Sequence, residues 1–515
     1  MLAQECPSRQ TRPRTVVDFG SGHSWNGVSV AHSQTAAFRQ RVRDHLHAPP
    51  AVVSGATPAL EVVARITNAG ASVAVVVDEG RLRGILTEQD VTRRIAGQAV
   101  AEMPVETLMS APVATVGEQQ PLYEAIGLMR RLGLRHMPVV DDTGMLVGMV
   151  HLHDALAAAN EGLVDQIDRL THEATLEGLR QVKAAQVQLA ADLLEDRVPA
   201  PEIQSLISWL NNDLGRRVLA QNVRALAADG WGEPPVAFSA IVMGSGGRGE
   251  SLLFPDQDNG YVLADYPDAA HGRIDPFFIE LAARMTAQLD TLGFPLCRGG
   301  VMAINPVWRK TRSQWQAQIR GWLGRRNEVA LQLCDVLFDF QSFYGETSLA
   351  EELGGVILRL CQANPGFLRA MFGVQADHRA ALGWFNRLVT ERADPMHRGE
   401  VNLKYAGTLP LAEAVRLLAL RRGVAATGTL ARIEALAEAG DLDHDTCDRL
   451  RGAFDHITGL QLRQQVADFR AGRPIGNFVD PDDLTARERD LLKDGFRAIN
   501  GFRDRLRVEL TGDVF

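Results

Sequence analysis

Apolar residues follow the same pattern twice between residue 50 and about residue 160. Each copy has a helical apolar stripe, a short apolar strand, a turn and a second strand that runs into an acidic residue. The first copy covers residues 58–66, 73–78 and 84–90, and the second covers residues 121–129, 136–141 and 148–154. The repeat predicts two equivalent α/β units, 49–104 and 105–160, that associate into one module.

Two other regions have helical spacing. Residues 161–232 contain few breakers apart from Pro199 and Pro201, which predicts a connector of two or more helices. Such a connector either carries a ligand-dependent rotation or forms a dimer bundle. Residues 347–515 are persistently helical, with Gly and Pro at the joints, and they predict a C-terminal helical bundle.

A third pattern lies between these helical regions. Residues 236–243 have the length and β-branched content of a buried strand, and the glycine-rich turn 244–249 follows it. Asp256 and Asp258 then lead into a second apolar strand, so both carboxylates project to one face. Two carboxylates together with substrate phosphates suit Mg²⁺, or Mn²⁺ in its place. Taken alone, the glycine turn is as consistent with a tight connection between two strands as with a phosphate-binding turn. The spacing of the two carboxylates favours a nucleotide site.

The same residues resemble a known superfamily. Gly-Ser-x-x-x-x-Glu, from Gly244 to Glu250, followed by Asp-x-Asp is similar to the nucleotidyltransferases that include DNA polymerase beta. Gly-Arg-Gly-Glu with Asp-Gln-Asp-Asn resembles the bacterial signal-transduction nucleotidyltransferases with CBS domains, the DUF294 family, which are related to the PII-protein uridylyltransferase. The resemblance implies transfer of UMP or AMP from an NTP to a hydroxyl of a regulatory protein.

This resemblance also implies a mixed sheet with helices at residues 233–346 and a helical substrate-binding domain after it. The triphosphate is expected to lie on Gly244 and Ser245, with the side chain of Arg248 beside them. A basic cluster at residues 309–312 offers Lys310 as a further phosphate ligand, and Lys404 is a more distant candidate. For both lysines the alternative is a solvated surface.

The superfamily uses a third carboxylate from a later strand. Residues 329–345, which we interpret as an apolar extended segment, supply Asp335 and Asp339. The resemblance favours Asp339, because in the uridylyltransferase relatives an Asp in a comparable segment precedes a short apolar stretch and a Gly-acidic pair, here Gly345-Glu346. The alternative for both is a strand edge or a helix start. Residues 296–305 read as an intervening strand without a carboxylate, so the chain lacks the third ligand if that ligand belongs there.

The internal repeat resembles a pair of CBS motifs. In that family a Thr/Ser-x-x-Asp sequence after the second strand contacts the ribose of an adenine nucleotide, and Thr87 and Asp90 match it. In the second copy Asp154 remains, but His151 replaces the hydroxyl residue. We therefore expect AMP or ATP chiefly at the first half. The alternative is a dimerisation surface that holds no ligand.

Composition and charge limit the number of domains, the partners and the cellular location that we expect. The chain has 515 residues, 46% of them apolar, which predicts several domains with conventional cores. Its net charge of −9 argues against nucleic acid as a main partner. Five dispersed Cys and no apolar stretch of membrane length favour a reducing cytoplasmic location away from membranes. Residues 1–48 read as an irregular or partly helical lead-in.

Three functional hypotheses remain. The first is a cytoplasmic transferase, most simply a homodimer, whose Mg²⁺ ligands are Asp256, Asp258 and Asp339. The second is a noncatalytic nucleotide sensor with a degenerate transferase domain. The third is a scaffold that has no nucleotide role.

Overall fold

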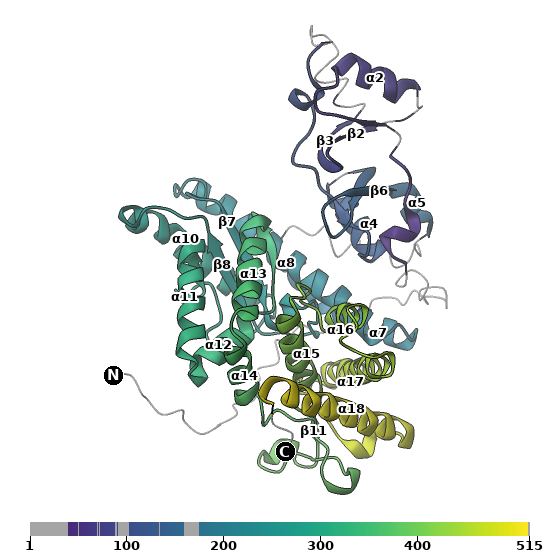
Figure 1. Cartoon of the computed structure of the whole chain (residues 1–515), viewed down its shortest axis with the longest axis vertical. Coiled ribbons are helices and arrows are strands. Elements are labelled where there is room, and N and C mark those ends of the chain that lie inside the picture. Colours follow the sequence, from purple (N-terminus) through teal and green to yellow (C-terminus); the bar gives the residue numbers. More distant parts are fainter. Residues whose placement is uncertain are drawn as a thin grey trace. The chain divides into compact units, whose positions relative to one another are not determined.

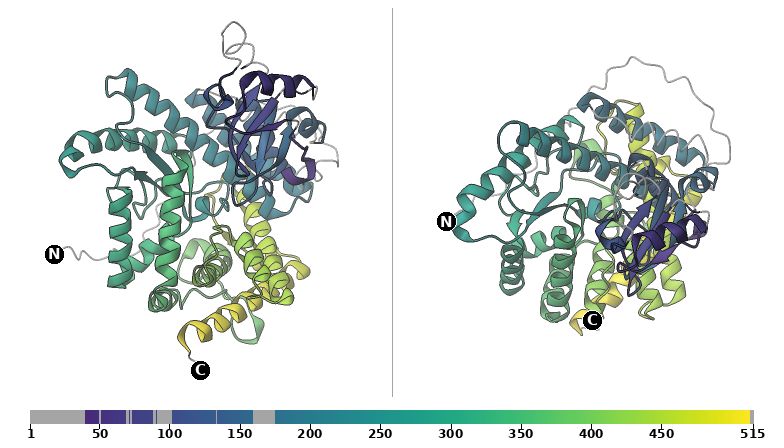
Figure 2. Two further views of the ribbon diagram at one scale, coloured as in Figure 1. Left: turned by 45° about the horizontal axis from the view of Figure 1, so that its top comes forward. Right: turned by 90° about the horizontal axis from the view of Figure 1, so that it is seen from above.

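The computed structural model describes residues 40–158, with gaps at 50, 69–70, 72, 88–89, 91–101 and 133, and residues 175–512. The chain forms two compact units, a smaller one of residues 24–173 and a larger one that begins at Ala174. Figures 1 and 2 show both units, which are described separately below. Within the described residues, no helix is long and apolar enough to cross a membrane.

The smaller unit confirms the internal repeat. Each half has a three-stranded sheet in which a short first strand is parallel to the second, and the third is antiparallel to the second. The first half contains β1 (Val52–Val53), α2 (Ala59–Asn68), β2 (Val73–Asp78) and β3 (Arg81–Thr87). The second contains β4 (Val116–Gly117), α4 (Leu122–Leu132), β5 (His136–Val140), β6 (Leu146–His151) and α5 (Leu152–Ala158). Runs of buried residues on the paired strands give each half its own small core.

The part of the expected lead-in that the structure describes contains a short helical turn. The 3₁₀ turn η1 (Val42–His45) packs on the second half, and Val42 is fully buried in that core. His47 then pairs with Met149 in an antiparallel bridge, and the two backbones exchange hydrogen bonds of 2.8 and 2.9 Å. Residues 40–47 therefore belong to the second half of the repeat. The lead-in before residue 40 lies outside the described residues.

The larger unit is built on a mixed sheet in the order β10-β7-β8-β9. Its strands are β7 (Phe238–Met243), β8 (Asn259–Leu263), β9 (Arg309–Thr311) and β10 (Phe340–Gly345). β7 is antiparallel to both neighbours, and β9 is parallel to β8. The glycine turn follows β7 as a four-residue helical turn, α9 (Gly244–Gly247). The two strands expected around the glycine turn and the carboxylates are thus confirmed.

Two sequence expectations for this sheet are wrong. Residues 296–305 form a loop with a single bridge between Gln257 and Leu296, and the neighbouring strand is the later β9. The apolar run at 329–337 is the helix α12 (Glu328–Leu337) and not an extended segment. A short apolar run is compatible with the residue spacing of a helix or of a strand. Here the side chain of Asn327 caps the helix by accepting a hydrogen bond from the Ala330 N–H at 2.9 Å.

Helices surround this sheet and continue to the C-terminus. Residues expected to form a connector contribute α7 (Leu176–Glu195) and α8 (Ala200–Ala228), which lie in the same compact unit as the sheet. The others around the sheet are α10 (His271–Thr291), α11 (Arg312–Arg325) and α13 (Thr347–Gln362). The C-terminal helices are α14 (Pro365–Val374), α15 (Leu409–Arg422), α16 (Thr429–Glu438), α17 (His444–Arg470) and α18 (Ala486–Thr511). Figure 1 shows α17 and α18 side by side.

One apolar core runs from the sheet into the C-terminal helices. It includes Ile241 of β7, Trp315 of α11, Leu353 of α13 and Phe496 of α18, all fully buried. The expected helical bundle at residues 347–515 is therefore present, and it shares its core with the sheet.

Candidate active site

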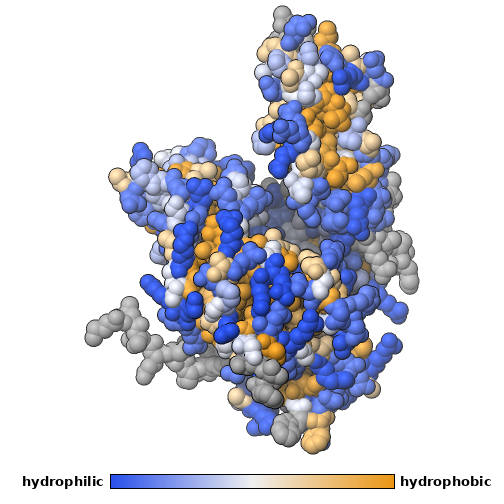
Figure 3. All heavy atoms as spheres, in the orientation of Figure 1, coloured by the Kyte–Doolittle hydropathy of each residue, from blue (hydrophilic) through white to orange (hydrophobic). Residues whose placement is uncertain are grey.

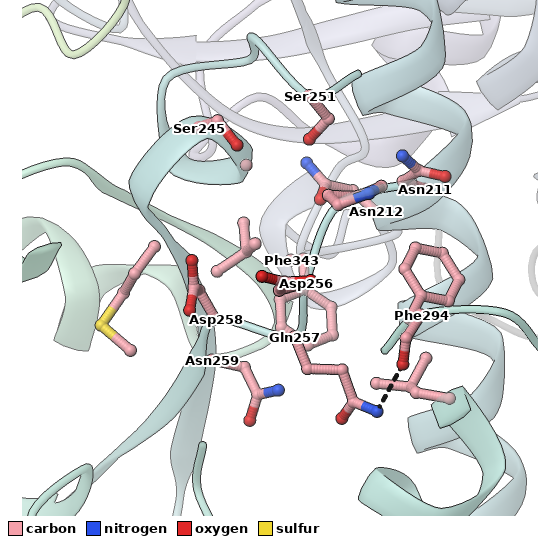
Figure 4. A pocket seen from close by; sticks show the side chains of 16 residues that line it. Asn211, Asn212, Ser245, Ser251, Asp256, Gln257, Asp258, Asn259, Phe294 and Phe343 are labelled. Carbon is pink, nitrogen blue, oxygen red and sulfur yellow. Dashed lines mark hydrogen bonds between the residues drawn. The ribbon is translucent and has the colours of Figure 1, made fainter. Parts of the chain in front are cut away.

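Asp256 and Asp258 lie between α9 and β8 and line one pocket (Figure 4). The glycine turn lies against Asp258, because a Cβ on Gly244 would be 3.2 Å from the Asp258 Oδ2 atom. Gly244 also has a φ of +62°, a backbone conformation that favours glycine. Ser245 lines the same pocket, so the structure brings together these four residues that the sequence predicted.

The pocket has about 530 Å³ of space, counted to its open mouth, and combines polar and aromatic walls. β7, β8 and the carboxylate loop form one side, and α8 forms the other (Figure 4). Its polar lining residues besides the two aspartates are Asn211, Asn212, Ser245, Ser251, Gln257 and Asn259, and its aromatic ones are Phe294 and Phe343. Charged, amide and aromatic groups thus face one space, which is typical of a small-molecule site.

The pKa of Asp258 lies above its usual value. Burial, together with the charge of the neighbouring Asp256, raises the pKa of Asp258 to about 6. A hydrogen bond from the Cys297 thiol and the charges of Lys404 and Arg248 act in the opposite direction. A bound cation relieves the repulsion between two neighbouring carboxylates.

Cys297 is a neighbour of this site that sequence analysis did not single out. The bridge between Gln257 and Leu296 brings the residue after Leu296 beside Asp258. Burial and the charge of Asp258 raise the pKa of the Cys297 thiol to about 11, so it remains a protonated donor. The loop 296–305 therefore supplies a thiol, and not a carboxylate, next to the pair. In the sequence, the only sign of this arrangement was that residues 296–305 contain no carboxylate.

Neutral hydrogen bonds hold the loop that carries the two aspartates. Side chains at positions 204 and 208 of α8 bond to the backbone of Glu250 and Ser251, at 2.8 and 2.7 Å. Gln465 of α17 accepts from the Leu253 N–H at 3.1 Å. These positions fix the backbone of the loop without adding charge to the site.

Asp339 does not join Asp256 and Asp258. It lies immediately before β10, is fully buried, and accepts hydrogen bonds from three guanidinium groups. The donors are Arg248 at 2.8 Å, Arg416 at 2.7 Å and Arg432 at 2.7 Å. Burial by itself raises the pKa of Asp339, but the three arginines outweigh it and hold that pKa well below its usual range. A carboxylate enclosed in this way is not available to a metal ion in the pocket, which corrects our assignment of Asp339 as a metal ligand.

Arg248 likewise does not face the pocket as expected. Its guanidinium is buried and donates to Glu250 at 2.6 Å and to Asp339. Asp335, on α12, accepts from Arg416. We call Arg248, Glu250, Asp335, Asp339, Arg416 and Arg432 the Asp339 cluster. Its three cations and three anions balance, so Arg248 is committed to the interior and not to a phosphate.

The two candidate lysines differ in position. Lys310 lies on β9 opposite Val262 and is not among the residues that line the pocket. Its neighbours Arg309 and Arg312 bind Asp275 and Asp265, so the basic cluster is largely neutralised. Lys404 begins the five-residue π-helix η7 (Lys404–Thr408), a rare element often found at functional sites. Its charge acts on Asp258.

In the smaller unit, Thr87 and Asp90 contact each other. The Thr87 N–H and hydroxyl donate to Asp90 Oδ2 at 3.0 and 2.8 Å, and the Ser110 hydroxyl donates to the other oxygen at 3.3 Å. In the second half, Asp154 instead lies 3.1 Å from the Nε2 atom of His47, with His151 at 3.9 Å. The two halves therefore differ at the positions that the sequence singled out.

Across the described ranges, no group of three or more His, Cys, Asp or Glu side chains is arranged to hold a metal ion. The fit to a divalent ion rests on Asp256 and Asp258. A pair of carboxylates suits Mg²⁺ when substrate phosphates and water complete its oxygen shell.

Comparison of the sequence with known protein families finds matches in both compact units. Residues 42–97 and 105–161 match the CBS domain, and residues 184–329 match the family described as "Putative nucleotidyltransferase DUF294". Residues 365–510 match the "Putative nucleotidyltransferase substrate binding domain". The chain is thus a CBS-domain protein. It belongs to those that join a CBS pair to this nucleotidyltransferase domain and its substrate-binding domain.

Curated relatives cover parts of the chain. It is 36% identical to an uncharacterized protein of Methanopyrus kandleri over 19% of this chain and 52% of that one. It is 31% identical to the CBS domain-containing protein YhcV of Bacillus subtilis over 19% of this chain and 71% of that one. It is 27% identical to an A-adding tRNA nucleotidyltransferase of Aquifex aeolicus over 24% of this chain and 15% of that one. The chain spans about half the length of the first of these relatives.

Among solved structures, a CBS domain protein of Pyrobaculum aerophilum complexed with AMP is similar. The identity is 26%, the match covers 24% of this chain and 97% of that one, and the TM-score is 0.23.

The Asp339 cluster generates a stability prediction. Asp339→Asn keeps the shape of the side chain but leaves an uncompensated positive charge in the interior. We expect the free energy of unfolding, measured by urea denaturation, to fall by about 3–5 kcal/mol. The control is Asp504→Asn, which breaks an ion pair with Arg379 in which both side chains are about half exposed. That variant should lose less than about 1 kcal/mol.

The same pair of proteins tests the pKa of Asp339. Because this pKa is depressed in the folded state, the stabilisation is present above the unfolded value of about 4 and is lost as the pH falls below it. The gap between wild type and Asp339→Asn should therefore be constant above pH ~4 and narrow in stronger acid. A loss no larger than that of Asp504→Asn at neutral pH contradicts the central role of Asp339.

Proposed function

We propose that the larger unit is a cytoplasmic, Mg²⁺- or Mn²⁺-dependent nucleotidyltransferase. It transfers UMP or AMP from a nucleoside triphosphate to a hydroxyl of a regulatory protein, in a reaction similar to that of the PII-protein uridylyltransferase. The observation that carries this proposal is the convergence of Asp256, Asp258 and Ser245 on one pocket under the glycine turn. The match of residues 184–329 to a nucleotidyltransferase family supports it.

The residues of the pocket have separate roles in this proposal. Asp256 and Asp258 hold the divalent ion, which when bound neutralises phosphate charge and stabilises the departing pyrophosphate. Ser245 and the adjacent backbone orient the triphosphate, and Lys404 adds a positive charge near Asp258. The acceptor hydroxyl oxygen forms a bond to the α-phosphorus and loses its proton to water, while the bond from that phosphorus to the pyrophosphate oxygen breaks and pyrophosphate leaves. The net charge of −9 favours a protein acceptor over nucleic acid.

A second candidate is a noncatalytic nucleotide sensor. It is favoured by Cys297, which stands beside Asp258 where a further carboxylate would assist catalysis, and by the enclosure of Asp339. In this reading the pocket binds a nucleotide, and the transferase domain relays the signal without turnover. The two candidates differ in whether pyrophosphate is released.

The first test of the transferase is a pair of carboxamide variants. Asp256→Asn and Asp258→Asn remove the ion-binding charges with little change in shape, so we expect pyrophosphate release to fall by at least about 100-fold. Release is measured with each NTP and Mg²⁺ in the presence of a cell lysate as acceptor source. The control is Asp268→Asn, an exposed carboxylate after β8 that does not line the pocket.

The outcomes separate the candidates. Release that persists in both variants rejects the proposed role of the two aspartates. Tight NTP binding by the wild type without release under any condition favours the sensor.

We further propose that the CBS pair binds an adenine nucleotide, AMP or ATP, through Thr87 and Asp90, and that this ligand regulates the transferase. The two side chains are already held together by hydrogen bonds, with Asp90 beside Ser110. In the second half, the contacts of Asp154 with His47 and His151 compete with a ribose hydroxyl.

Asp90→Ala is expected to weaken AMP or ATP binding by about tenfold or more, because a hydrogen bond to a charged group is lost. The measurement is isothermal titration calorimetry on the full chain. Asp154→Ala is the matched control, since it changes the equivalent position of the second repeat, and it should leave the affinity within about twofold. A reversed ranking of the two variants contradicts this assignment.

We also propose a homodimer that forms through the smaller unit. Figure 3 shows apolar residues gathered in a band over this unit. Several of its large apolar side chains are exposed, including Leu60 at 58%, Leu132 at 47% and Val52 at 46%. Exposed apolar surface of this kind is typical of an interaction site.

Light scattering after size-exclusion chromatography should therefore give twice the chain mass of 56.2 kDa. Leu60→Glu and Leu132→Glu should shift that mass toward the monomer, because a charge is costly in an apolar interface. A monomeric wild type at micromolar concentration contradicts the proposal.

A further inference from the structure

The α8 wall of the pocket contains a buried amide whose donor has no partner. Asn211 is only 7% exposed, and its Nδ2 atom has no hydrogen-bond partner among the described residues. Asn211 nevertheless lines the pocket together with Asn212 (Figure 4). Buried amide groups in folded proteins almost always have partners, so an unpartnered donor beside a pocket points to a group that a ligand can use.

The orientation of this amide is fixed from behind by Lys183. The Nζ atom of Lys183 donates to Asn211 Oδ1 at 2.8 Å, to Gln186 Oε1 at 3.0 Å and to the Leu253 carbonyl at 2.7 Å. Because a lysine ammonium only donates, the oxygen of Asn211 faces Lys183 and the nitrogen is left for the other side. In Figure 4 that nitrogen lies on the side toward Asn212 and Ser251.

Lys183 itself lies behind the wall, outside the residues that line the pocket, and is not a ligand for phosphate. It is 1% exposed, and its Nζ atom lies 4.3 Å from the centre of the Phe294 ring. Its three N–H groups are matched by the three oxygen partners described above. Burial lowers the pKa of Lys183 well below its usual value, and its Nζ atom is committed to these interior oxygens. The residues of α8 that line the pocket, Asn211, Asn212 and Gly215, are uncharged.

The chemistry of the wall selects an uncharged, flat occupant. Asn211 and Asn212 provide amide groups, while Phe294 and Phe343 provide aromatic surface. Gly215 of α8 leaves room for this arrangement, since a Cβ there would lie 3.3 Å from the Phe343 ring. A nucleobase has ring nitrogens and carbonyl oxygens that accept from an amide, and faces that contact aromatic rings. Phosphates belong instead on the side of Asp256 and Asp258, where a divalent ion offsets their charge.

We propose that Asn211 is a base-recognition residue for the nucleoside triphosphate and that Lys183 is the positioning residue that aims it. The inference rests on the proposed function, because it assigns the base end of the substrate whose phosphates lie at the carboxylates. It adds a specificity determinant from helices that precede the sheet in the chain.

The test compares ligands with and without a base. Equilibrium binding of ATP, UTP, GTP, CTP and inorganic tripolyphosphate is measured with Mg²⁺ on the full-length wild type, Asn211→Ala and Lys183→Met. Asn211→Ala should weaken the preferred NTP by about tenfold, the value of one net hydrogen bond, and should reduce the preference among the four bases. Tripolyphosphate affinity should stay unchanged. Lys183→Met should move the base preference in the same direction.

Asn222→Ala is the matched control. Asn222 is a buried asparagine of the same helix, its amide donates to the Val218 carbonyl and to Gln288, and it does not line the pocket. This variant should lose stability without changing the preference among NTPs. If Asn211→Ala does not fold, Asn211→Ser, which retains an oxygen acceptor for Lys183 but no amide donor, is measured in its place.

Each outcome decides a different question. Equal weakening of all four NTPs and tripolyphosphate by Asn211→Ala shows a structural role and overturns the inference. Unchanged affinity for the preferred NTP overturns it as well. A wild type that binds neither the NTPs nor tripolyphosphate refutes the proposed function itself.

Discussion

One buried carboxylate, Asp339, fixes the geometry of the larger unit. Three guanidinium groups from separate segments meet on it: Arg248 follows the glycine turn, Arg416 belongs to α15, and Arg432 belongs to α16. Each of these charges is costly to bury alone, so the three segments are stable only where their charges meet a common anion. The glycine turn and the C-terminal helices are therefore held in one arrangement by charge neutralisation as well as by apolar contact.

The other side of the carboxylate loop is held by a different kind of interaction. Neutral side chains of α8 and α17 bond to the loop backbone, and Lys183 bonds to its Leu253 carbonyl. These contacts order the loop but place no competing cation against Asp256 or Asp258. A site of this design keeps its negative charge available while its backbone is fixed, which favours preorganised binding.

The parts of the molecule that were predictable from sequence are those encoded locally. The glycine turn and the two aspartates lie within 15 residues of each other, and the CBS pair was evident because its pattern occurs twice. The role of Asp339 was not predictable, because its partners lie 77 to 93 residues away and no local pattern links them. The run at 329–337 fits a strand or a helix equally well, although Asn327 offered a capping signal. Cys297 became visible only through the pairing of Gln257 with Leu296.

The contact between Glu250 and Thr429 has a consequence for how such proteins change over evolutionary time. Glu250 belongs to the stretch matched by the nucleotidyltransferase family, and it accepts a buried hydrogen bond of 2.5 Å from the Thr429 N–H in the stretch matched by the substrate-binding family. Arg248 of the first stretch and Arg416 and Arg432 of the second also meet at Asp339, which lies between the two stretches. Sequence comparison recognises the two stretches separately. Replacement of either stretch by a distant counterpart would nevertheless leave a buried charge in the other without its partner. They are expected to be inherited together and to accept substitutions at these positions only in matched sets.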